Sequence, residues 1–142
     1  METLNLIKTA TLSSALLLVA GCGEYGDFST EQICRASLAA IKGKSPTIVV
    51  VDKKTIEAET ELDVFHISYK RPDDGKKWSY RCKVDKKRAV WAQGDGRWRD
   101  QAQDPTVRFN IDGDDIQILE TFPDGSAATS VNFNISMLGG KS

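Results

Sequence analysis

The chain has 142 residues, of which 40% are hydrophobic and 27% charged, as expected for one ordinary globular domain. Its formal net charge of −1 excludes a bulk electrostatic attraction to nucleic acid or to an anionic membrane. The charge is nevertheless uneven. Residues 70–99 hold 11 basic and 4 acidic side chains, residues 1–69 hold 6 and 9, and residues 100–142 hold 2 and 7. A basic segment with a net charge of +7 therefore lies between two segments with a net negative charge.

Residues 1–22 have the layout of an export signal. Lys8 and the amino terminus form a weakly basic start, the apolar stretch TATLSSALLLVA follows, and Gly21 and Cys22 end it. A basic start, an apolar core of roughly 7–15 residues and small residues at its end are typical of a secretory signal peptide. The stretch is shorter than the about 20 residues that a transmembrane helix needs.

The run Val19-Ala20-Gly21-Cys22 resembles the lipobox of bacterial lipoproteins. The resemblance implies cleavage before Cys22, diacylglyceryl attachment to its sulfur and acylation of the new amino terminus. Two or three acyl chains form a stable anchor, whereas one alone binds only marginally. Because Gly23 rather than Asp follows Cys22, the resemblance implies the outer membrane if the host has one, with the domain facing the periplasm or the cell surface. The alternative is an ordinary cleaved signal peptide with an incidental cysteine.

These features predict three parts: a signal peptide at 1–21, a lipid anchor with a short tether at 22–28, and a single domain at 29–142. With Cys22 assigned to the anchor, Cys34 and Cys82 remain. An even number of cysteines in an exported domain predicts a disulfide, with two buried free thiols as the alternative. The chain has one histidine, His66, so it is short of ligands for a metal site.

The segment STEQICRASLAAIKGK predicts the only clear helix. Ser29 or Thr30 can cap its start, and Gly43 and Pro46 end it. Cys34, Leu38 and Ile41 recur at helical spacing, so we expect them on one face, packed where Cys82 lies.

After Pro46 the hydrophobic pattern has a period of two, which predicts strands. In KWSYRCKV, Cys82 shares the apolar face with Trp78 and Tyr80. The last strand is expected over Ala127–Met137, with Met137 on its apolar side. Short turns between the strands predict a curved antiparallel meander of about six or seven strands carrying one N-terminal helix, an α+β fold. A small β-barrel with a helix is the alternative.

No set of residues stands out as catalytic. His66 and Ser68 share a strand face but have no nucleophile turn beside them, and the chain has no glycine-rich phosphate loop. The acidic doublets lie in turns, where Asp is favoured for local hydrogen bonding. We therefore expect a protein that is not an enzyme and that uses no cofactor or metal.

The basic segment 70–99 is the strongest binding candidate, because Arg and Trp are enriched in the residues that dominate interface energetics. We expect this segment to form a contact surface for an anionic partner. The residues assigned to that surface are Lys76, Lys77, Arg81, Lys83, Arg97, Trp98 and Arg99. The alternative is that Trp98 covers a sheet edge and the basic residues only solvate it.

Together these features predict a non-catalytic, membrane-anchored envelope lipoprotein that binds another protein and not nucleic acid. In size and lipidation alone it resembles the bacterial and prophage lipoproteins that include superinfection-exclusion, immunity and inhibitor proteins. One alternative is a structural or assembly accessory that binds peptidoglycan or anionic lipid headgroups. Another is a small-ligand carrier, if the sheet closes around a cavity. The sequence does not fix the oligomeric state.

Overall fold

The computed structural model describes residues 24–140, which form one helix, seven strands and two 3₁₀ turns. The elements in chain order are α1 (Thr30–Lys42), η1 (Pro46–Ile48), β1 (Val50–Ile56), β2 (Asp63–Lys70), β3 (Lys77–Asp85), β4 (Arg88–Gln93), β5 (Thr106–Asp112), β6 (Asp115–Thr121), β7 (Ala127–Asn134) and η2 (Ile135–Leu138). All neighbouring strands are antiparallel, and their order in the sheet is their order in the chain. The predicted α+β meander with one helix is confirmed.

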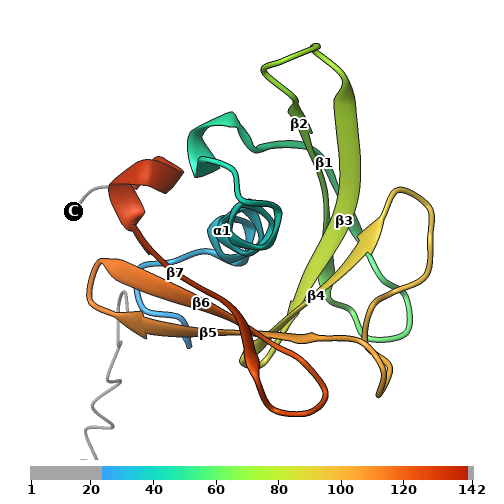
Figure 1. Ribbon diagram of the computed structural model, residues 1–142, viewed down its shortest axis with the longest axis vertical. Coiled ribbons are helices and arrows are strands. Elements are labelled where there is room, and N and C mark those ends of the chain that lie inside the picture. Colours follow the sequence, from blue (N-terminus) through green and yellow to red (C-terminus); the bar gives the residue numbers. More distant parts are fainter. Residues whose placement is uncertain (1–23, 141–142) are drawn as a thin grey trace, which may run out of the picture.

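The sheet is open, and it curves around α1 (Figure 1). Its edges, β1 and β7, each pair on one side only, so the β-barrel alternative is wrong. The junction between β4 and β5 is narrow, with only Arg88 opposite Arg108 and Ala89 opposite Val107. The sheet therefore has a four-stranded part, β1–β4, and a three-stranded part, β5–β7, which lie on two sides of the helix.

Helix α1 begins with a capping box. The Ser29 hydroxyl accepts a hydrogen bond from the Gln32 amide at 3.1 Å, and the Gln32 side chain accepts one from the Ser29 amide at 2.9 Å. Gly43 ends the helix with a φ of 65°, a left-handed conformation that glycine adopts without steric cost.

The buried surface of α1 is wider than the single face that the sequence predicts, because the sheet covers the helix from several directions. Ile41, expected on the buried face, is only half-buried at its edge. The residues that are buried are Ile33, Cys34, Ala36, Ser37, Leu38, Ala39 and Ala40. Several of them are small, which lets the strands approach the helix closely.

The Cys34–Cys82 disulfide joins the buried surface of α1 to the middle of β3 and confirms the predicted pairing. Both residues have no solvent exposure. The two cysteines are 48 positions apart, and closing a loop of that length stabilises the fold by about 4 kcal/mol in the chain-entropy model.

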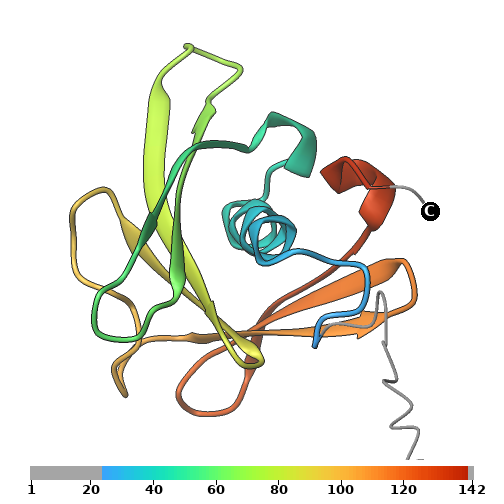
Figure 2. The ribbon, with the colours of Figure 1, turned by 180° about the vertical axis from the view of Figure 1, so that it is seen from behind.

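Residues 24–28, which the sequence assigns to the tether, pack against the domain. Phe28 is buried in the core, and the ring of Tyr25 meets that of Phe109 edge-on, with 5.6 Å between their centres. Figure 2 shows this segment leading into the start of α1. The ordered domain therefore already includes Glu24. The predicted signal peptide and the predicted lipidation site, Cys22, lie outside the described residues.

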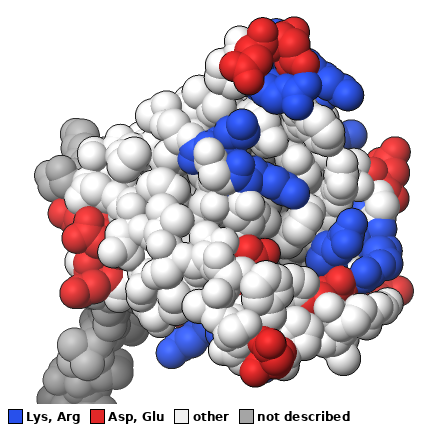
Figure 3. All heavy atoms as spheres, in the orientation of Figure 1, with Lys and Arg blue, Asp and Glu red and all other residues white. Residues whose placement is uncertain are grey.

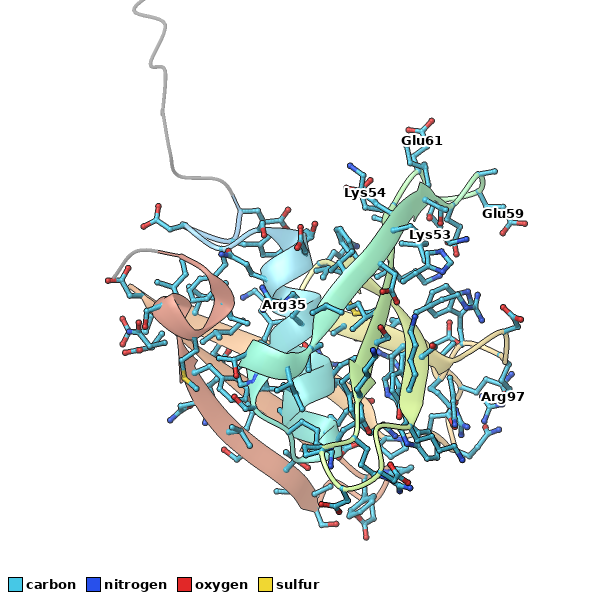
Figure 4. The ribbon with its side chains drawn as sticks, turned by 90° about the horizontal axis from the view of Figure 1, so that it is seen from above. Arg35, Lys53, Lys54, Glu59, Glu61 and Arg97 are labelled. Carbon is cyan, nitrogen blue, oxygen red and sulfur yellow. A yellow bond between two sulfur atoms is a disulfide. The ribbon has the colours of Figure 1, made fainter. Side chains whose placement is uncertain are left out.

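Arg35 closes the open side of the sheet. Its guanidinium donates to the carbonyls of Val49 at 2.9 Å, Pro46 at 3.1 Å and Leu138 at 3.1 Å. Figure 4 shows Arg35 between the C-terminal turn and the segment that leads into β1. One side chain of α1 thus connects the two ends of the sheet.

The last strand is shorter than predicted. It ends at Asn134, whose side-chain oxygen accepts a hydrogen bond from the Ser136 amide at 3.0 Å and so starts the turn η2. In this turn Ile135 and Leu138 are buried whereas Met137 is exposed, so the expectation that Met137 lies on the apolar side is wrong. Within residues 24–140, no helix is long and apolar enough to cross a membrane.

Candidate binding surface

The seven predicted contact residues do not form one surface. In β3, Tyr80 and Cys82 face α1, so Arg81 and Lys83 lie on the outer face of the sheet. The loop 94–105 between β4 and β5 folds back on this outer face and carries Arg97 and Trp98. Arg99, the next residue, lies instead over the ring of Trp91, which packs against the core.

On the outer face, Trp98 packs between two cations of β3. The Arg81 guanidinium lies 4.6 Å and the Lys83 ammonium 4.3 Å from the centre of its ring. Arg81 also donates to the carbonyls of Gly94, at 2.8 Å, and Gly96. These contacts hold the loop and its tryptophan on the sheet.

Two cations of the predicted surface, Lys83 and Arg97, are paired with carboxylates. Lys83 is buried, and its ammonium lies 2.9 and 3.0 Å from the two carboxylate oxygens of Glu57. Arg97 makes a bidentate ion pair with the buried Asp104, in which its two terminal nitrogens lie 2.8 and 2.9 Å from the two carboxylate oxygens. Figure 4 shows Arg97 at the outer side of the molecule, away from α1. Both cations therefore have partners within the protein.

The ion pair lowers the pKa of Asp104 to about 2. The largest cause is the hydrogen bond from Arg97, and the Gln101 amide, which donates to the same carboxylate at 3.0 Å, adds to it. Since Asp104 is close to the end of the loop and Arg97 to its start, this pair fixes the path of the loop between them.

A different group of cations lies at the end of the molecule where α1 terminates. The Lys42 ammonium is 4.4 Å from the centre of the Trp91 ring and 5.1 Å from that of Tyr80. The Arg99 guanidinium is 5.5 Å from the same Trp91 ring. Lys44 lies 5.6 Å from the ring of Tyr69. Each distance is within the range of a cation–π interaction.

The same arrangement continues at the β2–β3 hairpin, where Arg71 and Lys76 lie 5.8 and 5.0 Å from the centre of the Trp78 ring. Tyr69 stacks on Tyr80, with 6.0 Å between ring centres. We call this surface the cationic rim. Its members are Lys42, Lys44, Tyr69, Arg71, Lys76, Trp78, Tyr80, Trp91 and Arg99.

The rim has little internal charge compensation. Of its five cations, only Arg71 is in an ion pair with another of residues 24–140, the exposed Asp74. The pKa of Lys42 is lowered, mainly by burial and also by Arg99, while Glu120 opposes the shift. Figure 3, which views this end, shows Lys and Arg side chains near the centre and on the right. Four of the five rim cations therefore present positive charge that no carboxylate of residues 24–140 pairs.

The sequence identified part of the rim. Lys76 and Arg99 belong both to the predicted surface and to the rim, whereas Lys77 lies apart, 3.6 Å from Asp52 of β1. Lys42 and Lys44 were missed because they lie at the end of α1 and just after it, far from the basic segment in sequence. The available signal was a pair of lysines at the end of α1, but only the packing of α1 inside the sheet brings them to Trp91 and Tyr69.

The described residues contain no cluster of metal-binding side chains. Within 24–140, no three His, Cys, Asp or Glu side chains are placed to hold a metal ion. The ring of His66 lies 3.1 Å from the hydroxyl of Thr55, and the neighbouring Ser68 is buried. In comparisons with known proteins, the chain matched no family, no curated protein and no solved structure.

Arg97→Gln should give a stability defect that depends on pH. The folded pKa of Asp104, about 2, is below the usual value of about 3.9, so the pair stabilises the fold above pH 4. This contribution disappears as the pH falls from about 4 toward 2. The melting temperature of the variant should therefore be lower than that of the wild type at pH 7, and the difference should shrink in acid. Lys54→Gln, which removes an exposed charge on β1, is the control. A difference that stays constant from pH 7 to pH 2 would contradict the assignment.

Proposed function

We propose that the protein is a membrane-anchored, non-catalytic envelope lipoprotein that binds an acidic segment of another protein through the cationic rim. The observation that carries the proposal is the placement of Lys42 and Arg99 over the partly exposed Trp91 ring, with no carboxylate paired to either within residues 24–140. The lipobox-like leader supports the anchored location.

The rim combines two properties of a protein-binding surface. Unpaired cations speed the encounter with an acidic partner and favour it over a basic one. Tryptophan and tyrosine rings supply the large apolar contacts that dominate binding energy once water is excluded. Because the rings already hold Lys42 and Arg99 in place, binding would cost these side chains less conformational entropy than it costs free ones.

The position of the rim favours a protein partner over the lipid surface. Cys22 precedes the ordered segment by one residue, Gly23, and this segment leads directly into the start of α1. The helix has 13 residues, so it spans about 20 Å between the anchored end of the domain and Lys42. A rim on the far end of the helix would face away from the bilayer that holds the anchor.

The ligand-carrier alternative loses its support, because it depended on a closed barrel. The sheet is open, and α1 occupies its concave side (Figure 1). The accessory alternative, binding to peptidoglycan or to lipid headgroups, relies on the same basic residues. It differs from our proposal only in the partner, so identifying the partner distinguishes the two.

Lipidation is tested by Cys22→Ser. The variant should no longer incorporate labelled palmitate and should accumulate as an uncleaved precursor, because the sulfur that receives diacylglycerol is gone. The double variant Cys34→Ser/Cys82→Ser is the matched control: it also replaces cysteines, those of the disulfide, but should keep the label. Palmitate incorporation into the Cys22→Ser protein would contradict the anchor.

Binding is tested by removing charge from the rim. A photo-reactive residue in place of Lys44 captures the partner in cells, and the affinity of the purified partner is then measured. Lys42→Gln/Arg99→Gln should raise Kd about tenfold or more at low salt, since two charged contacts are lost. The effect should be smaller at high salt, where exposed charges are screened.

The control for this measurement is Lys53→Gln/Lys54→Gln, which removes the same charge from exposed positions of β1. Figure 4 shows both lysines near the β1–β2 end. If the two double variants weakened partner binding equally, the effect would come from net charge alone, and this would contradict a specific role for the rim.

A further inference from the structure

A polar groove lies on the outer face of the sheet and shares no lining residue with the cationic rim. It has a volume of about 400 Å³ and is lined by β4, the end of the loop 94–105, β5 and the β6–β7 hairpin. Its polar lining includes Arg88, Gln101, Thr106, Arg108 and Thr121. The groove lies at the narrow junction where only two residue pairs connect β4 to β5.

Arg88 and Arg108 lie directly opposite each other across this junction. Neighbouring strands bring such a pair to within about 5.5 Å between Cα atoms, so their side chains leave the same face side by side. Two like charges in this position destabilise a sheet unless a counter-charge lies between them.

Neither arginine is in an ion pair with another of residues 24–140. No side-chain hydrogen bond or ion pair connects either guanidinium to a described residue. The Nε atom of Arg88 is buried and lacks any hydrogen-bond partner. A buried donor left unpaired is costly, because it has lost its water without gaining an acceptor.

The two acidic residues of the groove do not supply the missing acceptor. Asp104 is already paired with Arg97 and with the Gln101 amide. Asp100 lies on the lining but makes no ion pair with a described residue. An additional anion between the two arginines would supply acceptors to their guanidinium groups and relieve the repulsion of the like charges.

We propose that this groove binds a phosphate group held between Arg88 and Arg108. The planar fork of a guanidinium matches two oxygens of a phosphate, and a tetrahedral phosphate has enough oxygens to engage two such forks at once. The hydroxyls of Thr106 and Thr121 and the amide of Gln101 add neutral donors on the same lining. The groove shares no lining residue with the cationic rim.

Isothermal titration calorimetry on the full-length lipidated protein in nonionic detergent tests the site, at constant ionic strength. The probes are inorganic phosphate and glycerophosphoglycerol, the water-soluble headgroup of phosphatidylglycerol. Arg108→Gln should weaken the binding of the preferred probe about tenfold or more, and Arg88→Gln should do the same. Lys54→Gln, an exposed charge remote from the groove, should leave it unchanged. Since Arg88 is partly buried, Arg108→Gln, at an exposed position, is the variant that keeps the test valid if Arg88→Gln fails to fold.

The two probes distinguish the source of the phosphate. Preference for inorganic phosphate indicates a free phosphate or phosphomonoester, and preference for glycerophosphoglycerol indicates a phospholipid headgroup; either result supports the site. The absence of binding by both probes would overturn the proposal. Binding that Arg108→Gln and Lys54→Gln reduce equally would overturn it too, because it would then be an effect of net charge.

Discussion

The burial of α1 inside one curved sheet is the constraint on which the rest of the structure depends. The described core is built from this helix and the inner faces of the strands, and the Cys34–Cys82 bond fixes the helix to β3. Because the sheet is open, its two ends need a separate connection. Arg35 provides it through three backbone carbonyls, so α1 is both the centre of the core and the link across the open side. The position of the helix then determines which cations meet which aromatic rings.

The basic segment shows that a local excess of charge does not by itself make a binding surface. Because side chains alternate along β3, Arg81 and Lys83 lie on the outer face, where both pack on Trp98. Arg81 also donates to backbone carbonyls, and Lys83 pairs with Glu57. Those charges hold a loop in place. Arg99, which adjoins Trp98, instead joins Lys42 at the end of α1. Trp98 and Arg99, although adjacent in sequence, thus make contacts on different faces of one sheet.

Local patterns were sufficient to predict much of the fold. The capping box, the period of two in the strands and an even pair of cysteines in a domain predicted to be exported led to the helix, the meander and the disulfide. The differences from prediction come from contacts between distant segments. Ile41 is half-buried because of how the sheet surrounds α1, and residues 24–28 are ordered because Phe28 enters the core. The ion pair of Arg97 with Asp104 and the contact of Arg99 with the Trp91 ring also form only when the chain folds, so no spacing in the sequence predicts them.

The claim that the cationic rim is covered by a partner is tested most directly by lysine acylation in intact cells, compared with the purified protein. The modification rates of Lys42 and Lys44 report on the rim, and those of the exposed Lys53 and Lys54 report on a surface with no assigned partner. Our account predicts that Lys42 and Lys44 are modified several-fold more slowly in cells than in the purified protein, while Lys53 and Lys54 react alike in both. The same cell-to-purified ratio at all four lysines would contradict it.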